Sequence, residues 1–479
     1  MPGAVMRGTL SAPAPTPGPL DMNDTLLLDS AASVGSGPRR GAWAVFLVAC
    51  ALVYIPNQRL FPAPELRGLN VTNVLILALW LAVLVAPGRT GPTPLRGRFI
   101  LLFAVYGWGL VAGRLDASGA WTEDLQTLKN ALTGPILFFL AFHAVGDRRA
   151  RMRLFVLLLA VTLFDVMLGL RQALDYGLTR YDEARRVAAP FSWSTSDANR
   201  AAAYFCIYVP LFSAFLLYRR GSAVARAAAF GALALGVFVS FYTYSRQAYA
   251  ILAALLLLLA LRRSRVLGVL AVVALLNYST WLPPSVLARI DMTISADARG
   301  PGAVTAPLSE EVDDSTASRL DIWRGAAGMI ADAPWGVGLG HFRAHIGQYA
   351  PRYAGYDAHD DYVLITAENG VLAPLVLVML LLGLFRLGRA LERQAVDAQM
   401  RLFGVGLWLS TLAVALVNIY GSRFEDANLM AGYWILAGMA AREHADRRGS
   451  ERANIPCASG RAGQIGCESA LRNAGTQQG

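Results

Sequence analysis

Long apolar runs separated by short polar segments make up most of the chain. A helix that crosses a bilayer needs about 20 predominantly apolar residues, and twelve runs approach that length. The pattern predicts an all-α fold, a polytopic transmembrane helix bundle of about 12 spans. The predicted spans cover residues 42–56, 71–87, 99–113, 127–146, 154–170, 201–218, 227–243, 247–261, 266–282, 362–385, 402–419 and 428–441.

Three polar segments divide the chain. Residues 1–40 are rich in Ala, Pro, Gly and Ser without periodicity, which is typical of a disordered arm. Spans 1 to 9 then fall within 41–282 and spans 10 to 12 within 362–441. Between the two groups lies the only long predicted loop, 283–361, and a polar tail, to which we assign no function, covers 442–479.

Basic residues give the predicted bundle its orientation. The loops on one predicted side carry 17 Arg and Lys in 46 residues, whereas the short loops on the other side carry 10 in 67. Cytoplasmic loops are enriched in these residues, so we expect both chain ends in the cytoplasm and loop 283–361 outside. The net charge of +10 therefore indicates membrane orientation and not nucleic-acid binding. The four cysteines lack C-x-x-C spacing and a nearby histidine, so they indicate neither disulfides nor zinc.

A transporter built from two similar halves is the alternative from a different class. Such a protein is expected to have a long inner loop after span six. Here the long loop follows span nine, and the loop after span six is only residues 219–226. The arrangement disfavours a transporter, and a polysaccharide or lipid exporter is kept as the alternative reading.

The second half of the long loop predicts an amphipathic helix. It begins after a Ser/Thr/Asp-rich start near Asp314 and ends before Pro334. Its apolar positions recur at helical spacing, and two arginines flank them; the apolar residues are Leu320, Trp323, Ala327 and Ile330, and the arginines are Arg319 and Arg324. Both arginines reach lipid headgroups in the simplest interpretation, and for Arg319 a functional role is an equal alternative.

A glycine-rich turn and two histidines follow this helix. Residues 334–340 lack the Lys-Ser/Thr ending of a phosphate-binding P-loop, so a turn that packs the loop onto the bundle is favoured. His341 and His345 are four residues apart, which is a spacing found in metal sites. No Glu stands between them in the zinc-protease pattern and no third ligand is evident, so we predict no metal.

His359 directly precedes the tenth predicted span, at a helix N-terminus that favours anions. Glu368 and Asn369 lie roughly 10 to 15 Å further along that helix, where polar groups normally face a cavity or a partner. An interfacial His359 and a Glu368 that only packs helices together form the structural alternative. Further polar residues near outer ends of spans are available to complete a cavity: Asn199, Arg200, Arg246, Arg171, Arg185 and Arg186.

Several short elements occur in a fixed order. They are Asp197 with Asn199, Ser245 with Arg246, Arg319 with Trp323, a turn containing Pro334, Gly336, Gly338, Gly340 and Phe342, and His359 followed by Tyr362, Glu368 and Gly370. This order, with the predicted topology, resembles the O-antigen ligase and O-antigen polymerase superfamily of bacterial membrane glycosyltransferases. Asp360 departs from the pattern, since Asn is usual there.

The resemblance implies an inner-membrane enzyme with a periplasmic active site. Its donor would be a glycan on undecaprenyl diphosphate, and its acceptor the lipid A core, a second lipid-linked glycan or, as in a third relative, a protein. His359 is then the expected base, Arg246 and Arg319 bind the diphosphate, and the supporting residues are Asp360, Asp361, Glu368, Asn199 and Arg200. A base opposite the cationic groups predicts inversion without metal or cofactor. The sequence does not identify the acceptor.

Overall fold

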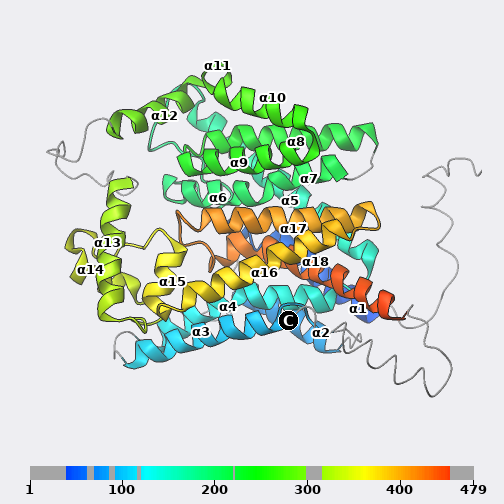
Figure 1. Cartoon of the computed structure of the whole chain (residues 1–479), viewed down its shortest axis with the longest axis horizontal. Helices are drawn as coiled ribbons and strands as arrows, with labels where there is room; N and C mark the ends of the chain where they lie inside the picture. Colours follow the sequence, from blue (N-terminus) through cyan, green and yellow to red (C-terminus); the bar gives the residue numbers. More distant parts are fainter. Residues whose placement is uncertain are drawn as a thin grey trace, which may run out of the picture. The chain divides into compact units, whose positions relative to one another are not determined.

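The fold is helical throughout the part of the chain described by the computed structural model, which comprises residues 39–61, 70–85, 92–115, 120–218, 222–297 and 316–453 (Figure 1). No strand occurs in these ranges, and the predicted all-α class is confirmed. The predicted disordered arm, apart from its last residues, and most of the polar tail lie outside the described residues.

The helices follow one another with short connections. They are α1 (Arg39–Tyr54), α2 (Val71–Val85), α3 (Arg96–Leu115), α4 (Trp121–Ala144), α5 (Arg148–Tyr176), α6 (Ala198–Tyr208), α7 (Pro210–Tyr218), α8 (Ala223–Phe241), α9 (Arg246–Arg263), α10 (Arg265–Leu276), α11 (Tyr278–Trp281), α12 (Pro284–Asp297), α13 (Thr316–Asp332), α14 (Phe342–Tyr349), α15 (Asp361–Asn369), α16 (Ala373–Arg393), α17 (Ala398–Val417) and α18 (Ala427–Ala453). Single 3-10 turns cover Gln58–Leu60, Thr195–Asp197 and Pro351–Tyr353.

Six helical segments of the described chain are long and apolar enough to cross a membrane. They are Arg96–Leu115, Arg148–Tyr176, Ala198–Tyr218, Ala223–Phe241, Ala373–Arg393 and Ala398–Val417. Three shorter apolar helices cover Gly41–Tyr54, Val71–Val85 and Arg265–Leu276. A helix occurs at each of the twelve predicted spans, but six meet the length and hydropathy of a span, and the count of about 12 stays a prediction.

The tenth predicted span is not one continuous helix, which corrects the sequence interpretation. α15 ends at Asn369, Gly370 has φ +92°, and α16 begins at Ala373. Glycine is the residue that best tolerates this left-handed conformation, and Asn-Gly followed by a proline is a helix-stop signal. Nine residues of α15 extend about 14 Å at 1.5 Å per residue, too little to cross a bilayer. Glu368 therefore lies at the end of a short separate helix and not inside a span.

The core is built around close contacts of α17 and α18 with their neighbours. A Cβ placed on Gly388 of α16 would lie 2.7 Å from the backbone nitrogen of Trp408, and one on Gly438 of α18 would lie 2.4 Å from the carbonyl oxygen of Phe138 in α4. Small residues let helices in a membrane approach this closely. The fully buried Trp408 and Trp434 fill the space beside these contacts.

Ion pairs connect loops that the basic-residue count assigns to the same side. Arg148 pairs with Asp397 and Glu443, which lie in or next to three segments predicted to be cytoplasmic. On the predicted outer side, Arg59 lies 3.8 Å from Asp197, and Arg200 pairs with Asp426. These pairs support the predicted alternation of the loops, and the orientation of the bundle remains a prediction.

The predicted amphipathic helix corresponds to α13, which ends at Asp332 as expected (Figure 1). Its buried stripe differs from the predicted one, because Ile322, Ala326 and Met329 face the interior while Leu320 is 43% exposed. Apolar residues of this helix recur on two adjacent faces, and packing against α14 and α15 selects one of them. The predicted stripe was therefore wrong by part of a turn.

Candidate functional site

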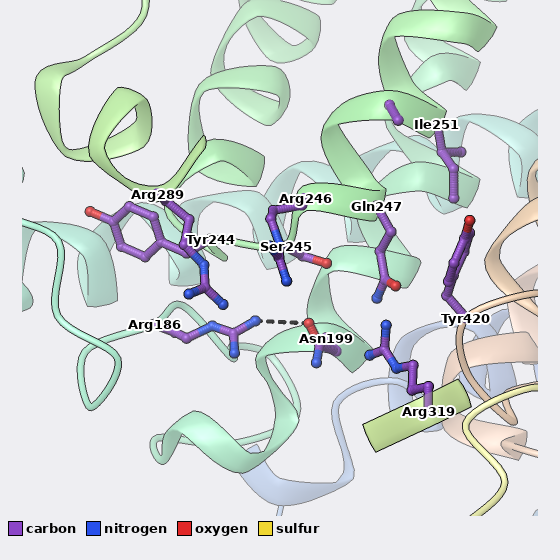
Figure 2. A pocket seen from close by; sticks show the side chains of 11 residues that line it. Arg186, Asn199, Tyr244, Ser245, Arg246, Gln247, Ile251, Arg289, Arg319 and Tyr420 are labelled. Atoms are coloured by element: carbon purple, nitrogen blue, oxygen red, sulfur yellow. Dashed lines mark hydrogen bonds between the residues drawn. The ribbon is translucent and has the colours of Figure 1, made fainter. Parts of the chain in front are cut away.

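A cavity of about 280 Å³ lies where α6, α9, α12, α13 and the α17–α18 connection meet (Figure 2). Its lining combines polar, cationic and a few apolar side chains. The lining residues are Arg186, Asn199, Tyr244, Ser245, Arg246, Gln247, Ala250, Ile251, Arg289, Arg319 and Tyr420. Residues from six separate stretches of sequence thus line one cavity, which we call the arginine pocket.

Four arginines make this pocket cationic. Arg186, Arg246, Arg289 and Arg319 all line it, and no carboxylate from the described residues does so. Glu183 contacts two of them from outside the lining, at 2.7 Å from Arg186 and 3.5 Å from Arg289. The lining itself is therefore positively charged, which favours an anionic ligand.

Arg246 reaches the pocket because it opens α9. The preceding Tyr244 has φ +49°, which turns the chain into the helix, and Ser245 is its N-cap residue. The Ser245 side chain is only 3% exposed, and its hydroxyl has no hydrogen-bond partner among the described residues. A helix N-terminus with a guanidinium and an available hydroxyl suits a phosphate group.

Arg319 reaches the same pocket from α13, pointing toward Gln247 and Tyr420 (Figure 2). Arg186 is fixed at the opposite side by donating to the carbonyl oxygen of Thr243 at 2.9 Å and to Asn199 Oδ1 at 2.8 Å. Arg324, also on α13, is 75% exposed and pairs with Asp321 at 2.7 Å. The two arginines of α13 therefore have different surroundings.

His359 is not among the residues that line the arginine pocket. It is a non-glycine residue with φ +52°, a conformation that costs about 1–3 kcal/mol and persists only where neighbours impose it. Its neighbours do so: the carbonyl oxygen of Ala358 accepts from Trp323 Nε1 at 2.9 Å, and the Asp360 carboxylate accepts from the Val363 N–H at 2.9 Å. The Asp361 N–H donates to the carbonyl oxygen of Asn418 at 2.9 Å, which joins this segment to the α17–α18 connection that also carries Tyr420.

Residues 209–378 match the family model described as O-antigen ligase. This segment, about a third of the chain, is similar to the O-antigen ligase family, and we call it the O-antigen ligase domain. No curated protein matches the chain significantly. The matched segment includes Arg246, Arg289, Arg319 and His359, so three of the four arginines of the pocket and the expected base belong to the O-antigen ligase domain.

The predicted supporting residues separate into different surroundings. Asn199 lines the pocket, whereas Arg200 pairs with Asp426 at 2.6 Å and lies over the Phe191 ring at 4.4 Å. Asp360 is the N-cap of α15, and Asp361 is buried. The contact of Arg200 with Asp426 joins α6 to the α17–α18 connection, outside the matched segment.

Glu368 fixes the glycine-rich turn of the O-antigen ligase domain. Its carboxylate accepts from the Phe342 N–H at 3.1 Å, and its carbonyl oxygen accepts from the Gly338 N–H at 3.0 Å. A Cβ on Gly338 would lie 2.3 Å from the Cα of Gly113 in α3. The turn therefore packs the loop onto the bundle, as the sequence indicated.

His341 and His345 have a structural setting. His341 Nε2 lies 2.9 Å from Asp124 Oδ1, and Asp124 also pairs with Arg114. The two imidazole rings stack with centroids 6.4 Å apart. Among the described residues, no group of three or more His, Cys, Asp or Glu side chains is arranged to hold a metal ion.

Sequence reasoning missed Arg289, Gln247 and Tyr420 as pocket residues and named Arg186 only as one of several loop arginines. Arg289 lies on α12, six residues after the Pro283–Pro284 pair that ends the preceding apolar run. An arginine between apolar residues at the start of the predicted outer loop 283–361 was the available signal.

A second cavity, of about 500 Å³, lies on the other face of α9 and is almost entirely apolar. The lining residues are Val237, Phe241, Tyr249, Leu252, Ala253, Leu256, Leu257, Ala271, Ala274, Leu275, Tyr278, Trp281, Leu282 and Ile290. Two elements border both cavities: α9 contributes Gln247 to the arginine pocket and Tyr249 to the apolar one, while α12 contributes Arg289 and Ile290.

Proposed function

We propose that the protein is an O-antigen ligase-like membrane glycosyltransferase. It moves a glycan from undecaprenyl diphosphate to an acceptor hydroxyl on the periplasmic side of the bacterial inner membrane. The observation that carries the proposal is the arginine pocket, which four arginines line and which α9 and α12 separate from an apolar cavity. The family match of residues 209–378 supports the same reaction class.

A lipid diphosphate explains both cavities with one ligand. Guanidinium groups make paired, charge-assisted contacts with phosphate oxygens, and Arg246 with Arg319 supplies such groups from opposite walls. A polyprenyl chain is favoured in an apolar cavity because its transfer out of water is favourable, and α9 and α12 border both that cavity and the pocket. An uncharged or fully hydrophilic donor leaves one of the two cavities unexplained.

The proposed step is a direct displacement at the anomeric carbon of the donor sugar. The acceptor oxygen forms the new bond, the bond from that carbon to the diphosphate oxygen breaks, and His359 accepts the hydroxyl proton. The arginines stabilise the charge that develops on the leaving diphosphate, so no metal is needed. The strained backbone of His359 supports this assignment, since such strain gathers at functional sites.

Asn199 is proposed to orient Arg186, and Asp360, Asp361, Glu368 and Arg200 to keep the outer segments in place. The acceptor in this proposal is the lipid A core. A polymerase that uses a second lipid-linked glycan shares every feature of the donor site.

The test uses radiolabelled undecaprenyl-diphosphate-linked glycan with purified protein in liposomes, supplied with acceptor lipid. A transferase releases undecaprenyl diphosphate, whereas an exporter relocates the intact donor without release. His359→Ala should abolish release, and His345→Ala, on the neighbouring α14, serves as the matched control. Full release by His359→Ala would remove the proposed base, and transport of intact donor by the wild type would replace the function. Chelation with EDTA should leave release unchanged.

A further inference from the structure

The connection between α17 and α18, residues 418–426, is held rigidly at the edge of the arginine pocket. Asn418 Oδ1 accepts from the Arg423 N–H at 3.0 Å, and the Asn418 carbonyl oxygen accepts from the Asp361 N–H at 2.9 Å. At its other end Asp426 pairs with Arg200. The backbone position of Arg423 is thus fixed relative to the segment that carries His359.

The Arg423 side chain lines a small cavity of about 10 Å³ next to the arginine pocket. Four residues line both spaces: Asn199, Gln247, Ile251 and Tyr420. The small cavity has room for about one water molecule. Tyr420 is 42% exposed, so its ring is not locked by packing, and it stands with Gln247 at the boundary between the two spaces.

The Arg423 guanidinium has neither a hydrogen bond nor an ion pair with any described residue, although it is largely buried. Burial lowers its pKa below the ordinary value; the Asp426 carboxylate opposes this, Arg200 adds to it, and Asp357 and Asp197 oppose it to a smaller extent. A buried charge without a direct partner is costly. Arg151 illustrates the opposite solution, since its buried guanidinium donates to two carboxylates and two carbonyl oxygens.

We propose that Arg423 binds an anionic oxygen of the substrate, a phosphate or carboxylate oxygen, on the side of the arginine pocket that faces the His359 segment. The proposal rests on the proposed transferase function. The electrostatic influence of Asp357, two residues before His359, on Arg423 supports this position. The anionic group belongs either to the lipid diphosphate or to the acceptor, and the following experiment distinguishes these sources.

Arg423→Gln removes the charge and Arg423→Lys keeps it without the planar guanidinium. Arg352→Gln, an exposed arginine in the same outer region, is the matched control. Each variant is measured in three ways: melting temperature, affinity for undecaprenyl diphosphate in detergent, and rate of glycan transfer in liposomes. Because Arg423 lacks a direct partner, the melting temperature of Arg423→Gln should be no lower than that of the wild type. If Arg423 had a structural role, its replacement would lower the melting temperature.

We expect Arg423→Gln to lower transfer at least tenfold, Arg423→Lys to restore part of the loss, and Arg352→Gln to behave as wild type. A tenfold weaker affinity of Arg423→Gln for undecaprenyl diphosphate assigns the anionic group to the donor. Unchanged affinity with a raised KM for the acceptor assigns it to the acceptor. Wild-type transfer and affinity in Arg423→Gln overturn the proposal. A melting temperature of Arg423→Gln below that of the wild type, with unchanged transfer in Arg423→Lys, also overturns it. If the wild type itself neither binds nor releases undecaprenyl diphosphate, the proposed function fails together with this inference.

Discussion

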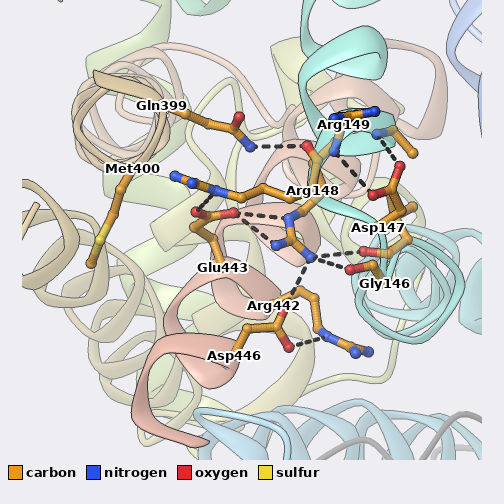
Figure 3. Close-up of polar contacts among 12 residues, drawn as sticks. Gly146, Asp147, Arg148, Arg149, Gln399, Met400, Arg442, Glu443 and Asp446 are labelled. Carbon is orange, nitrogen blue, oxygen red and sulfur yellow. Dashed lines mark hydrogen bonds and ion pairs between the residues drawn. The ribbon is translucent and has the colours of Figure 1, made fainter. Parts of the chain in front are cut away.

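Two groups of arginines lie on opposite sides of the predicted bundle. Their buried charge is compensated in different ways. In the first, which we call the paired network, Arg148 and Arg151 meet Asp397, Glu443 and Asp446 (Figure 3). Arg151 is only 2% exposed, and its guanidinium donates to two carboxylates and two carbonyl oxygens at 2.9 to 3.1 Å. In the arginine pocket, four guanidinium groups share a cavity with Glu183 as their nearby carboxylate (Figure 2).

The difference separates structural charge from functional charge. A buried ion that is paired and hydrogen-bonded is compensated within the protein. Removing one partner leaves the other charge buried and unpaired, which destabilises the fold. An excess of one sign around a cavity is compensated only when a ligand of opposite sign binds. We therefore expect substitutions in the paired network to change stability and substitutions in the pocket to change substrate binding and transfer.

The largest effect is expected in the paired network. Arg151→Ala leaves Glu443 and Asp446 without their buried partner and should lower the free energy of unfolding by about 3–5 kcal/mol. Unfolding in denaturing detergent measures the change. Arg149→Ala, an exposed neighbour on the same helix, is the control and should stay within about 0.5 kcal/mol of wild type. Equal effects of the two substitutions would contradict the distinction.

The next effect is expected in the pocket. Arg246→Ala removes a guanidinium from the leaving diphosphate and should lower transfer on the order of 10²-fold, as when one donor is removed from a charge-stabilising site. Arg263→Ala, at the other end of α9, provides the control. The transfer rates of both variants are measured in liposomes. A loss of stability without a loss of transfer in Arg246→Ala would show that Arg246 has a structural role.

The sequence was sufficient to predict the helical class and the position of α13. Hydropathy and the basic-residue bias depend on local composition, so one sequence carries them. The convergence of Arg186, Arg246, Arg289 and Arg319 depends on how distant helices pack, and a single sequence holds no direct record of such contacts. Only the resemblance to a family brought Arg246 and Arg319 together.

The break between α15 and α16 was missed for a more specific reason. Residues 362–385 form a nearly continuous apolar run, and hydropathy outweighed the Asn369-Gly370 stop signal and Pro374. The Glu368 hydrogen bonds explain why a break is useful there, because they anchor the turn that follows α13.

A smaller effect is expected at that anchor, where the buried Glu368 side chain accepts a hydrogen bond from the Phe342 N–H. Glu368→Ala leaves the Phe342 N–H without its acceptor and should cost about 1–3 kcal/mol of stability. Glu368→Gln keeps an acceptor oxygen and should retain most of the stability. Thermal melting of both variants measures the difference, and equal losses would indicate that the negative charge, not the hydrogen bond, holds the turn.

The smallest effect concerns Glu425, in the connection next to Arg423. Burial and the nearby Asp361 carboxyl raise the pKa of Glu425 from its ordinary 4.5 to about 8. The folded state therefore binds this proton more tightly than the unfolded state, so its contribution to stability is complete below about 4.5 and is lost as pH rises toward about 8. Glu425→Gln should flatten that decline, which melting temperatures measured across this pH range would show. An unchanged pH profile would show that Glu425 ionises normally.

The central claim is that the arginine pocket binds the lipid diphosphate, and the two arginines of α13 provide its most direct measurement. The affinity for undecaprenyl diphosphate should be measured for wild type, Arg319→Ala and Arg324→Ala in the same detergent. We predict that Arg319→Ala binds at least tenfold more weakly while Arg324→Ala binds as wild type does. Equal affinity of all three proteins, or a loss confined to Arg324→Ala, would contradict the account.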